Sequence, residues 1–245
     1  MSKTTGKTRD NSKSSRGPHL AAVVLDLDDT LYLERDYARS GLLAVGRYLA
    51  SHGHVEGIGE WMWQEFCQGR HDQLFNAANE HFRLHLEPIH LSDMVEYYRN
   101  HRPQIQPTPE ALALLEALRG RVKLGLLSDG FLPAQQYKLD ALGLRGRFDA
   151  VLFTESLGRA FWKPSPVGFE KLAAELGVPN AACAYVGDNP AKDFLAPNQL
   201  GWRTVQWRQE GQVHADKTAP AGGAAQHLAG SVEEVLSALG LPHER

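Results

Sequence analysis

The chain has 245 residues, of which 42% are hydrophobic and 22% are charged. Such a chain is long enough to bury one large core or two smaller ones. Its formal net charge of −3 provides no global positive field to recruit nucleic acid or an anionic membrane, so we expect neither as a partner.

Residues 1–19 differ in composition from the rest of the chain. They carry five basic side chains against Asp10, a net charge of +4, and they are rich in Ser, Thr and Gly. This composition predicts a disordered basic tail. The tail lacks the apolar segment of a secretory signal, and no stretch approaches the roughly 20 apolar residues of a membrane span. With only Cys67 and Cys183, no disulfide framework is expected, and a cytoplasmic location is predicted.

Strand-like and helix-like segments alternate over most of the chain. Five apolar, β-branched segments are predicted as strands: residues 21–27, 122–127, 150–153, 182–186 and 203–207. Between and after them lie predicted helices at residues 110–118, 133–142, 166–176, 191–200 and 232–239. This alternation predicts an α/β fold, a Rossmann-like parallel sheet with helices on both faces.

Residues 34–107 break the alternation. They hold long amphipathic stretches and many aromatic residues but no convincing strand. We expect a small helical cap domain here, inserted after the first strand, with its aromatic residues mainly forming its own core. The Rossmann-like core, which would carry any catalytic site at its sheet edge, would then consist of residues 20–33 and 108–245.

Polar side chains follow four of the predicted strands. Asp26 and Asp28 come at the end of the first strand and Ser128 after the second. Lys163 follows the third strand, at the predicted start of a helix, and Asp188 follows the fourth. Because a parallel sheet brings the carboxyl ends of its strands to one edge, we expect these side chains to lie together.

This set of side chains suits phosphoryl transfer. Three carboxylates can hold one hard dication such as Mg²⁺, which prefers oxygen ligands. A lysine, a serine hydroxyl and the backbone N–H groups near Asp129 and Gly130 can hold a phosphate. Phosphoryl transfer needs little beyond a nucleophile, charge neutralisation and an acid for the leaving group.

Four short motifs follow one another along the chain: Asp26-Leu27-Asp28-Asp29-Thr30-Leu31, Ser128, Lys163-Pro164 and Gly187-Asp188-Asn189-Pro190-Ala191-Lys192-Asp193. In these motifs and their order, over about residues 20–207, the chain resembles the haloacid dehalogenase superfamily. This resemblance implies that Asp26 is the nucleophile, forming an aspartyl-phosphate, and also a metal ligand. It implies that Asp28 protonates the leaving oxygen and then activates water, while its backbone carbonyl contacts the metal.

The same resemblance assigns the remaining roles. Ser128 and Lys163, with Asp129 and Gly130, would bind the transferring phosphoryl group. Asp188 would complete the Mg²⁺ site, and Asp193 would orient Lys163 or the water around the metal. Thr30 and Asn189 are also expected to support the site, by holding the metal-binding residues in place without contacting the metal themselves.

The residue types at two places limit which reactions of the superfamily the chain can catalyse. Asp28 favours phosphoryl transfer, because the dehalogenases of this superfamily lack an acid at that position. Residues 34–107 contain no lysine, which excludes the Schiff-base lysine that phosphonate cleavage would need in the cap. The chain is therefore expected to be a Mg²⁺-dependent phosphatase of a small phosphorylated metabolite, acting as a monomer or homodimer. A phosphomutase of the same fold and a non-catalytic ligand-binding or scaffold protein remain as alternatives.

The second motif departs from the family pattern at Asp129, where many relatives carry Asn. Its carboxylate either points away from the phosphate or lowers the affinity for highly anionic substrates. Trp162, directly before Lys163, either contacts the organic part of the substrate or packs against the core.

Overall fold

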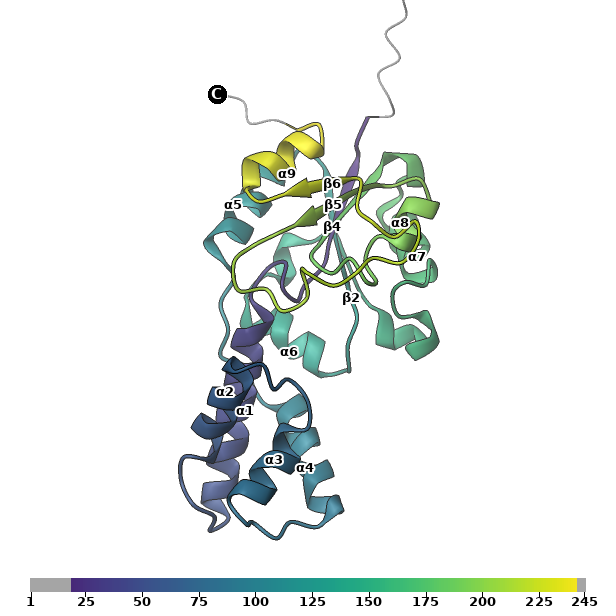
Figure 1. The fold of residues 1–245 in the computed structure, drawn as a ribbon. Coiled ribbons are helices and arrows are strands. Elements are labelled where there is room, and N and C mark those ends of the chain that lie inside the picture. The colour runs from purple at the N-terminus through teal and green to yellow at the C-terminus, as the bar shows by residue number, and fades with distance from the viewer. Residues whose placement is uncertain (1–18, 242–245) are drawn as a thin grey trace, which may run out of the picture.

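The computed structural model describes residues 19–241, so the predicted basic tail, apart from His19, lies outside the described residues. Its centre is one sheet of six parallel strands in the order β3-β2-β1-β4-β5-β6 (Figure 1). This confirms the predicted α/β class. The strands are β1 (Ala22–Leu25), β2 (Lys123–Ser128), β3 (Ala150–Phe153), β4 (Cys183–Gly187), β5 (Arg203–Trp207) and β6 (His227–Ala229).

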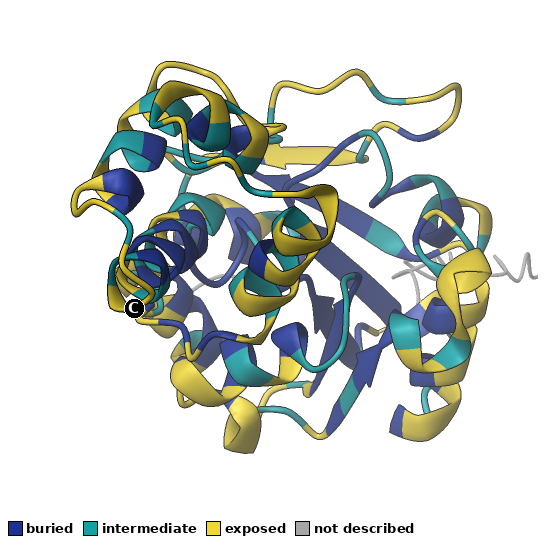
Figure 2. Cartoon of the chain, turned by 90° about the horizontal axis from the view of Figure 1, so that it is seen from below, coloured by how far each residue is buried: buried dark blue, intermediate teal, exposed yellow. Residues whose placement is uncertain are grey.

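Helices cover both faces of the sheet, and alternate residues of β1 pack against each side. Val23 and Leu25 belong to the core beneath one set of helices, whereas Ala22 and Val24 belong to the core beneath the other. All four are fully buried, which explains the unbroken apolar run. In Figure 2 the strands in the middle of the sheet are dark blue, the colour of buried residues. The first face carries α5 (Pro109–Leu118), α6 (Ala134–Ala141) and α9 (Val232–Ala238), and the second α7 (Val167–Leu176) and α8 (Leu195–Gln199).

Local sequence signals place several helix ends. The Thr108 hydroxyl accepts a hydrogen bond from the backbone N–H of Ala111, 3.1 Å away, and so caps the start of α5. Ser231 caps α9 in the same way through Glu234 N–H. Gly177 ends α7 with a left-handed φ of 65°, a conformation that costs glycine little.

Three elements differ from the prediction. The helix expected at residues 191–200 is only α8, because side-chain to backbone hydrogen bonds hold the preceding residues in turns. Lys163 does not open a helix, since α7 begins at Val167. Strand β6 was not predicted, because it is short and lies at an edge of the sheet with two of its three residues exposed. Short 3₁₀ turns occur at Arg145–Arg147, Thr154–Leu157, Arg159–Phe161 and Asn180–Ala182.

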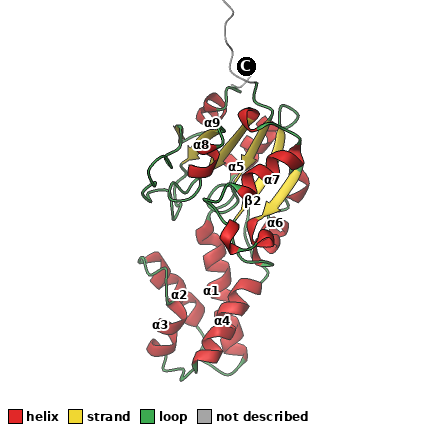
Figure 3. Cartoon of the chain, turned by 90° about the vertical axis from the view of Figure 1, so that its right-hand side faces the viewer, coloured by secondary structure: helices red, strands yellow, loops and turns green. Residues whose placement is uncertain are grey.

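Between β1 and α5 the chain forms a group of helices that lies beyond the carboxyl edge of the sheet (Figure 3). The group has a hydrophobic core of its own, separate from the two cores of the sheet. Its first two helices cross closely, since a Cβ at Gly46 would lie only 2.5 Å from the Gly59 nitrogen. The helices are α1 (Glu34–Ser51), α2 (Ile58–Cys67), α3 (Leu74–His81) and α4 (Pro88–Asn100).

His101 joins the end of this helical group to its beginning. The His101 ring lies 2.5 Å from the Tyr98 carbonyl oxygen and 3.0 Å from Ser40 Oγ, which also accepts a bond from Gln104 N–H. Burial lowers the pKa of His101 and so favours its neutral form. Within residues 19–241, no helix combines the length and apolarity needed to cross a membrane.

Candidate active site

The site lies where the strand order reverses direction, between β1 and β4. The chain runs outward from β1 through β2 to β3 on one side, and from β4 to β6 on the other. Asp26 directly follows β1, and its backbone N–H donates to the Val186 carbonyl of β4, 2.9 Å away. Asp188 directly follows β4. Open α/β sheets bind their ligands at this type of position.

Three buried carboxylates gather at this edge. Asp26, Asp188 and Asp193 each place a carboxylate oxygen within 4.8 Å of those of the other two. Asp188 Oδ2 is buried and has no hydrogen-bond partner among the described residues. Burial, together with neighbouring negative charge, raises the pKa of Asp26 to about 7 and that of Asp188 to about 10. If all three carboxylates are ionised, their negative charge exceeds the positive charge that neighbouring described residues bring to the cluster.

Lys163 supplies positive charge to the cluster. Its Nζ lies 2.7 Å from Asp26 Oδ1 and 2.8 Å from Asp193 Oδ1, and it donates to the Tyr185 hydroxyl at 2.8 Å. Burial alone would lower the pKa of Lys163, but the charges of Asp193 and Asp26 outweigh it and raise the pKa. The ammonium is therefore held charged beside the predicted nucleophile.

Asp193 is fixed from its other side by the turn that follows β4. Its Oδ2 accepts a hydrogen bond from Asn189 N–H at 2.9 Å, and Asn189 Oδ1 accepts one from Ala191 N–H. Gly187 leaves room for this arrangement, because a Cβ there would lie 2.6 Å from Asp193 Oδ2. Asp193 thus reaches the carboxylate cluster itself. Its predicted role, orienting Lys163 or the metal's water, stays a prediction.

The second motif forms a tight loop after β2. Ser128 is fully buried, and its Oγ lies 2.7 Å from Gln135 Nε2. Gly130 has a φ of 137°, and a Cβ there would lie 2.8 Å from the Gln135 side chain. Only glycine fits both the backbone conformation and the space.

The Asp129 carboxylate points into the protein rather than standing free beside the loop. It accepts hydrogen bonds from the Thr154 hydroxyl at 2.7 Å and from Lys163 N–H at 3.1 Å. Lys192 Nζ lies 3.4 Å from its other oxygen. Asp129 therefore ties the second motif to the lysine motif.

Asp28 faces α6 rather than the carboxylate cluster. Its Oδ1 accepts hydrogen bonds from Lys138 Nζ at 2.7 Å and from the Tyr32 hydroxyl, and its Oδ2 accepts one from Gln135 Nε2 at 2.7 Å. Burial would raise the pKa of Asp28, but Lys138 and these hydrogen bonds outweigh it and lower the pKa. The proposed contact of its backbone carbonyl with the metal stays a prediction.

Asp29 and Thr30 shape the loop that carries Asp28. Asp29 has a left-handed φ of 53°, and its carboxylate accepts hydrogen bonds from Glu34 N–H at 2.7 Å and Val213 N–H at 2.6 Å. It thereby fixes the start of α1 and the loop after β5 against the first motif. The Thr30 hydroxyl is buried without a hydrogen-bond partner among residues 19–241, so its supporting role stays a prediction.

A cavity of about 430 Å³ opens beside this site. Trp162 lies in its wall, held by a hydrogen bond from its indole N–H to Glu155 and by an edge contact with Phe131. The predicted residues Asp28, Asp129, Gly130, Lys163 and Asn189 line it, and the helical group contributes Glu34, Tyr37, Tyr98 and Arg99.

Four further polar residues at this cavity were not predicted as site residues: Gln135, Lys138, Lys192 and His214. Gln135 and Lys138 are three residues apart in a predicted helix that follows the second motif. This spacing places both side chains on the same face of the helix, which is the feature of the sequence that indicates them. Lys192 stood within the fourth motif. His214 sits in a polar loop without periodicity, where nothing in the sequence indicates its partner Glu34, 3.1 Å away.

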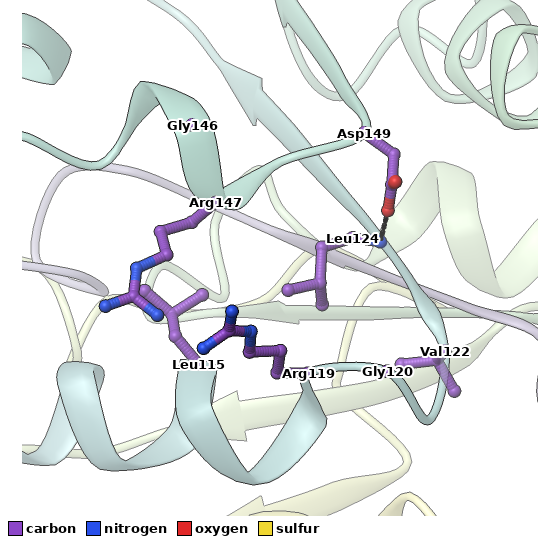
Figure 4. A pocket seen from close by; sticks show the side chains of 8 residues that line it. All are labelled: Leu115, Arg119, Gly120, Val122, Leu124, Gly146, Arg147 and Asp149. Carbon is purple, nitrogen blue, oxygen red and sulfur yellow. Dashed lines mark hydrogen bonds between the residues drawn. The ribbon is translucent and has the colours of Figure 1, made fainter.

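Another cavity, of about 460 Å³, lies at the opposite edge of the sheet (Figure 4). Its wall includes Leu124 at the start of β2, and two of its polar residues, Arg119 and Arg147, pair with Glu116. Asp149 also lines it and accepts a hydrogen bond from Leu124 N–H. Since these polar groups are already partnered, the cavity carries no arrangement comparable to that at the carboxyl edge.

Comparison with known proteins agrees with this geometry. The chain is 35% identical over 140 residues to the pyrimidine 5′-nucleotidase YjjG of Escherichia coli, a match that covers 56% of this chain and 60% of that protein. It is 30% identical over 231 residues to a phosphoserine phosphatase of Thermus thermophilus, covering 80% of this chain and 92% of that protein. Relatives named as phosphatases thus span most of the chain.

Solved structures share the fold. A HAD family hydrolase from Deinococcus radiodurans, determined with bound phosphate and sodium, superposes with a TM-score of 0.64 at 20% identity, covering 92% of this chain and 99% of that chain. The family description "haloacid dehalogenase-like hydrolase" matches residues 20–201, which include all four motifs. The chain therefore belongs to the haloacid dehalogenase-like hydrolases, and within them to the phosphatases.

Proposed function

We propose that the protein is a Mg²⁺-dependent phosphatase that hydrolyses a small phosphate monoester through an aspartyl-phosphate on Asp26. The observation that carries this proposal is the meeting of Asp26, Lys163 and two further buried carboxylates at one sheet edge, where Ser128 ends the neighbouring strand β2. A nucleophile, a fixed cation and a set of oxygen ligands are the parts that phosphoryl transfer requires.

The residues present suit a hard dication. Asp188 offers a buried oxygen that has no hydrogen-bond partner within residues 19–241, and carboxylate oxygens of Asp26, Asp188 and Asp193 lie within 4.8 Å of one another. Among the described residues, the three clustered carboxylates of Asp26, Asp188 and Asp193 share one lysine, Lys163, which pairs with two of them, so the ionisation of all three leaves an excess of two negative charges. We propose that Asp26, Asp188 and the backbone carbonyl of Asp28 hold Mg²⁺, which when bound neutralises charge on the phosphoryl oxygens.

The chain's own residues account for the bond changes. Asp26 attacks phosphorus, the bond to the ester oxygen breaks, and a proton from Asp28 goes to that oxygen as the alcohol leaves. A water molecule then attacks the aspartyl-phosphate, gives its proton to Asp28 and releases inorganic phosphate and free Asp26. Ser128 and Lys163 bind the phosphoryl oxygens in both steps. Asp129, through Lys163 N–H, keeps the lysine motif in place.

The helical group supports a second part of the proposal. Helices α1 and α4 contribute Tyr37, Tyr98 and Arg99 to the cavity wall, so they stand over the place where the organic part of a substrate would lie. The Arg99 guanidinium also lies over the ring of Phe131, 3.8 Å from its centre, which links α4 to the loop after β2. We propose that residues 34–107 act as the cap that closes over the bound ester and excludes bulk water.

The test is phosphate release from a panel of phosphorylated metabolites, with Mg²⁺ and with chelator. The panel includes a pyrimidine nucleoside monophosphate and phosphoserine, because two relatives are named for activity on such compounds. Asp26→Asn should abolish release while the fold persists. Asp72→Asn removes the same charge from an exposed position and should release phosphate at the wild-type rate.

Release that needs Mg²⁺ and is lost in Asp26→Asn would support the phosphatase. Undiminished release in Asp26→Asn would contradict the nucleophile. A folded protein that binds Mg²⁺ but releases no phosphate from any compound would instead favour a phosphomutase or a non-catalytic ligand-binding role.

A further inference from the structure

Lys138 is a buried cation whose partner must change during the proposed reaction. Its side chain is 8% exposed, and its Nζ lies 2.7 Å from Asp28 Oδ1 and 4.1 Å from the centre of the Tyr37 ring. Asp28 is the carboxylate partner of Lys138 in the structure. A buried ammonium that loses its partner is strongly disfavoured unless another anion replaces it.

Asp28 cannot act on the ester oxygen of a substrate while its carboxylate accepts the hydrogen bonds seen in the structure. Both of its oxygens already accept hydrogen bonds, from Lys138 and Tyr32 on one and from Gln135 on the other. Neither oxygen is therefore free to approach the ester oxygen of a substrate. If Asp28 acts as the acid, as the proposed function requires, it must release Lys138 when the substrate is bound.

The position of Lys138 limits what can replace Asp28. Both residues line the same cavity, so a bound substrate reaches both. Because Asp28 would contact the ester oxygen, and Lys138 contacts Asp28, the ammonium lies about one carboxylate group away from that oxygen. An anionic group on the carbon next to the ester oxygen would therefore come within reach of Lys138.

The remaining charged groups in the cavity wall do not offer another anion for Lys138. Asp129 is engaged by Thr154 and Lys163 N–H, and Glu34 pairs with His214. Arg99 adds a further cation to the wall from α4. Once Asp28 has released it, Lys138 is therefore a cation of the described cavity wall that a substrate anion could pair with.

We propose that Lys138 is a substrate-binding residue that exchanges Asp28 for a second anionic group on the substrate. The preferred substrates are then phosphate monoesters that carry a carboxylate on the carbon next to the ester oxygen. Binding of that group frees Asp28 to act on the ester oxygen, so the same contact selects the substrate and releases the acid. This inference rests on the proposed function and goes beyond it by naming the substrate class.

Binding can be measured apart from turnover with two phosphonates that differ only in the charge in question. They are 3-phosphonopropionate, which carries the carboxylate, and propylphosphonate, in which a methyl group replaces it. In calorimetric titrations with Mg²⁺, the wild type should bind 3-phosphonopropionate at least about tenfold more tightly than propylphosphonate. A factor of this size is what one charge-assisted hydrogen bond usually contributes to affinity. Lys138→Met should reduce this ratio to near one, and Lys138→Arg should retain part of it.

A matched control is Lys171→Met, which removes a lysine from an exposed position on α7 and should keep the wild-type ratio. Turnover is compared in parallel with phosphoglycolate and ethyl phosphate, where the carboxylate should raise kcat/KM by a similar factor. If Lys138 only supports Asp28, Lys138→Met will lower kcat/KM for both esters equally and leave the binding ratio unchanged, which overturns the proposal.

The proposal also falls if the wild type binds the two phosphonates equally or binds neither. It falls if the preference is lost in Arg99→Gln but kept in Lys138→Met. Should Lys138→Met fail to fold, the wild-type ratio and Lys138→Arg still decide. Failure of the proposed function is distinct, because it appears as absence of phosphate release from every ester, whatever the binding ratio.

Discussion

Lys163 Nζ lies 2.7 Å from Asp26 Oδ1, although the two residues are 137 positions apart in the chain and both are buried. Asp193 shares the same ammonium at 2.8 Å. Removal of one partner from a buried ionic group leaves the others with uncompensated charge. The ammonium of Lys163 therefore matters to the stability of the fold as well as to phosphate binding.

Lys163→Met should abolish turnover and lower the free energy of unfolding by about 3 kcal/mol near pH 8. The loss should be smaller at pH 5, because burial raises the pKa of the Asp26 carboxyl to about 7, so that this carboxyl can then bind a proton. Urea denaturation in the presence of chelator, repeated at the two pH values, measures this difference. An equal loss at both would show that Lys163 stabilises the fold by packing rather than by charge.

The stability of the metal-free protein should fall as the pH rises from 5 to 8. In the folded state the pKa of Asp26 is about 7 and that of Asp188 about 10, both above the ordinary value of 3.8. A carboxyl with a raised pKa stabilises the fold fully below its unfolded pKa, and this contribution is lost as the pH rises through its folded pKa.

Mg²⁺ should reverse that loss. Metal binding requires the carboxylates to be ionised, so the rise in Tm on adding Mg²⁺ should be larger at pH 8 than at pH 6. Calorimetric scans with chelator and with Mg²⁺ measure both effects, with Asp188→Asn as the variant in which the gain should shrink. A larger gain at pH 6 would be inconsistent with ionised aspartates as the ligands.

Gly187→Ala should reduce kcat by at least about tenfold, because a group displaced by a fraction of an ångström in a preorganised site loses much of its effect. The added Cβ would lie 2.6 Å from Asp193 Oδ2 and 3.0 Å from the Tyr185 ring, so Asp193 must move. Gly146→Ala is the matched control, since a Cβ there meets no atom within 4 Å. Steady-state kinetics that rank the two variants alike would contradict this account of Gly187.

Asp129→Asn tests whether the carboxylate acts on the substrate or only on the loop. An Asn oxygen can still accept from the Thr154 hydroxyl and from Lys163 N–H, whereas the contact with Lys192 loses its charge. We expect a stability loss of about 1 kcal/mol and less than a fivefold change in kcat/KM. A gain in affinity of tenfold or more for anionic esters would instead assign Asp129 a direct, repulsive effect on the substrate.

The loop after β5 should hold the first motif in place through Gln212. Its Nε2 donates to the Asp29 carbonyl at 2.7 Å and to the Trp207 carbonyl at 2.9 Å, and Val213 N–H donates to the Asp29 carboxylate. Gln212→Ala should lower the unfolding free energy by about 1 to 2 kcal/mol, since buried carbonyls lose their donor. Hydrogen exchange of the loop should speed up in this variant, and an unchanged exchange rate would argue against the tether.

The sequence alone determined the class of fold and the residues at the ends of the strands. Unbroken apolar runs such as Ala22–Leu25 indicate strands buried on both faces, and their alternation with helical segments leaves a parallel sheet as the consistent arrangement. Because parallel strands share one carboxyl edge, the sequence predicts that Asp26, Ser128 and Asp188 lie at the same edge of the sheet.

Only the tertiary structure decided which of these groups touch. Asp28 and Asp26 are two residues apart, yet Asp28 turns to Lys138 of α6 while Asp26 turns to Lys163. The packing of the fold decides which lysine lies beside each carboxylate, and that lysine sets the direction in which the carboxylate points. The two residues of each lysine–aspartate pair are more than 100 positions apart in the chain. Local periodicity shows which residues face a common edge, but it carries no information on their partners across the fold, and those partners set the charge of each group.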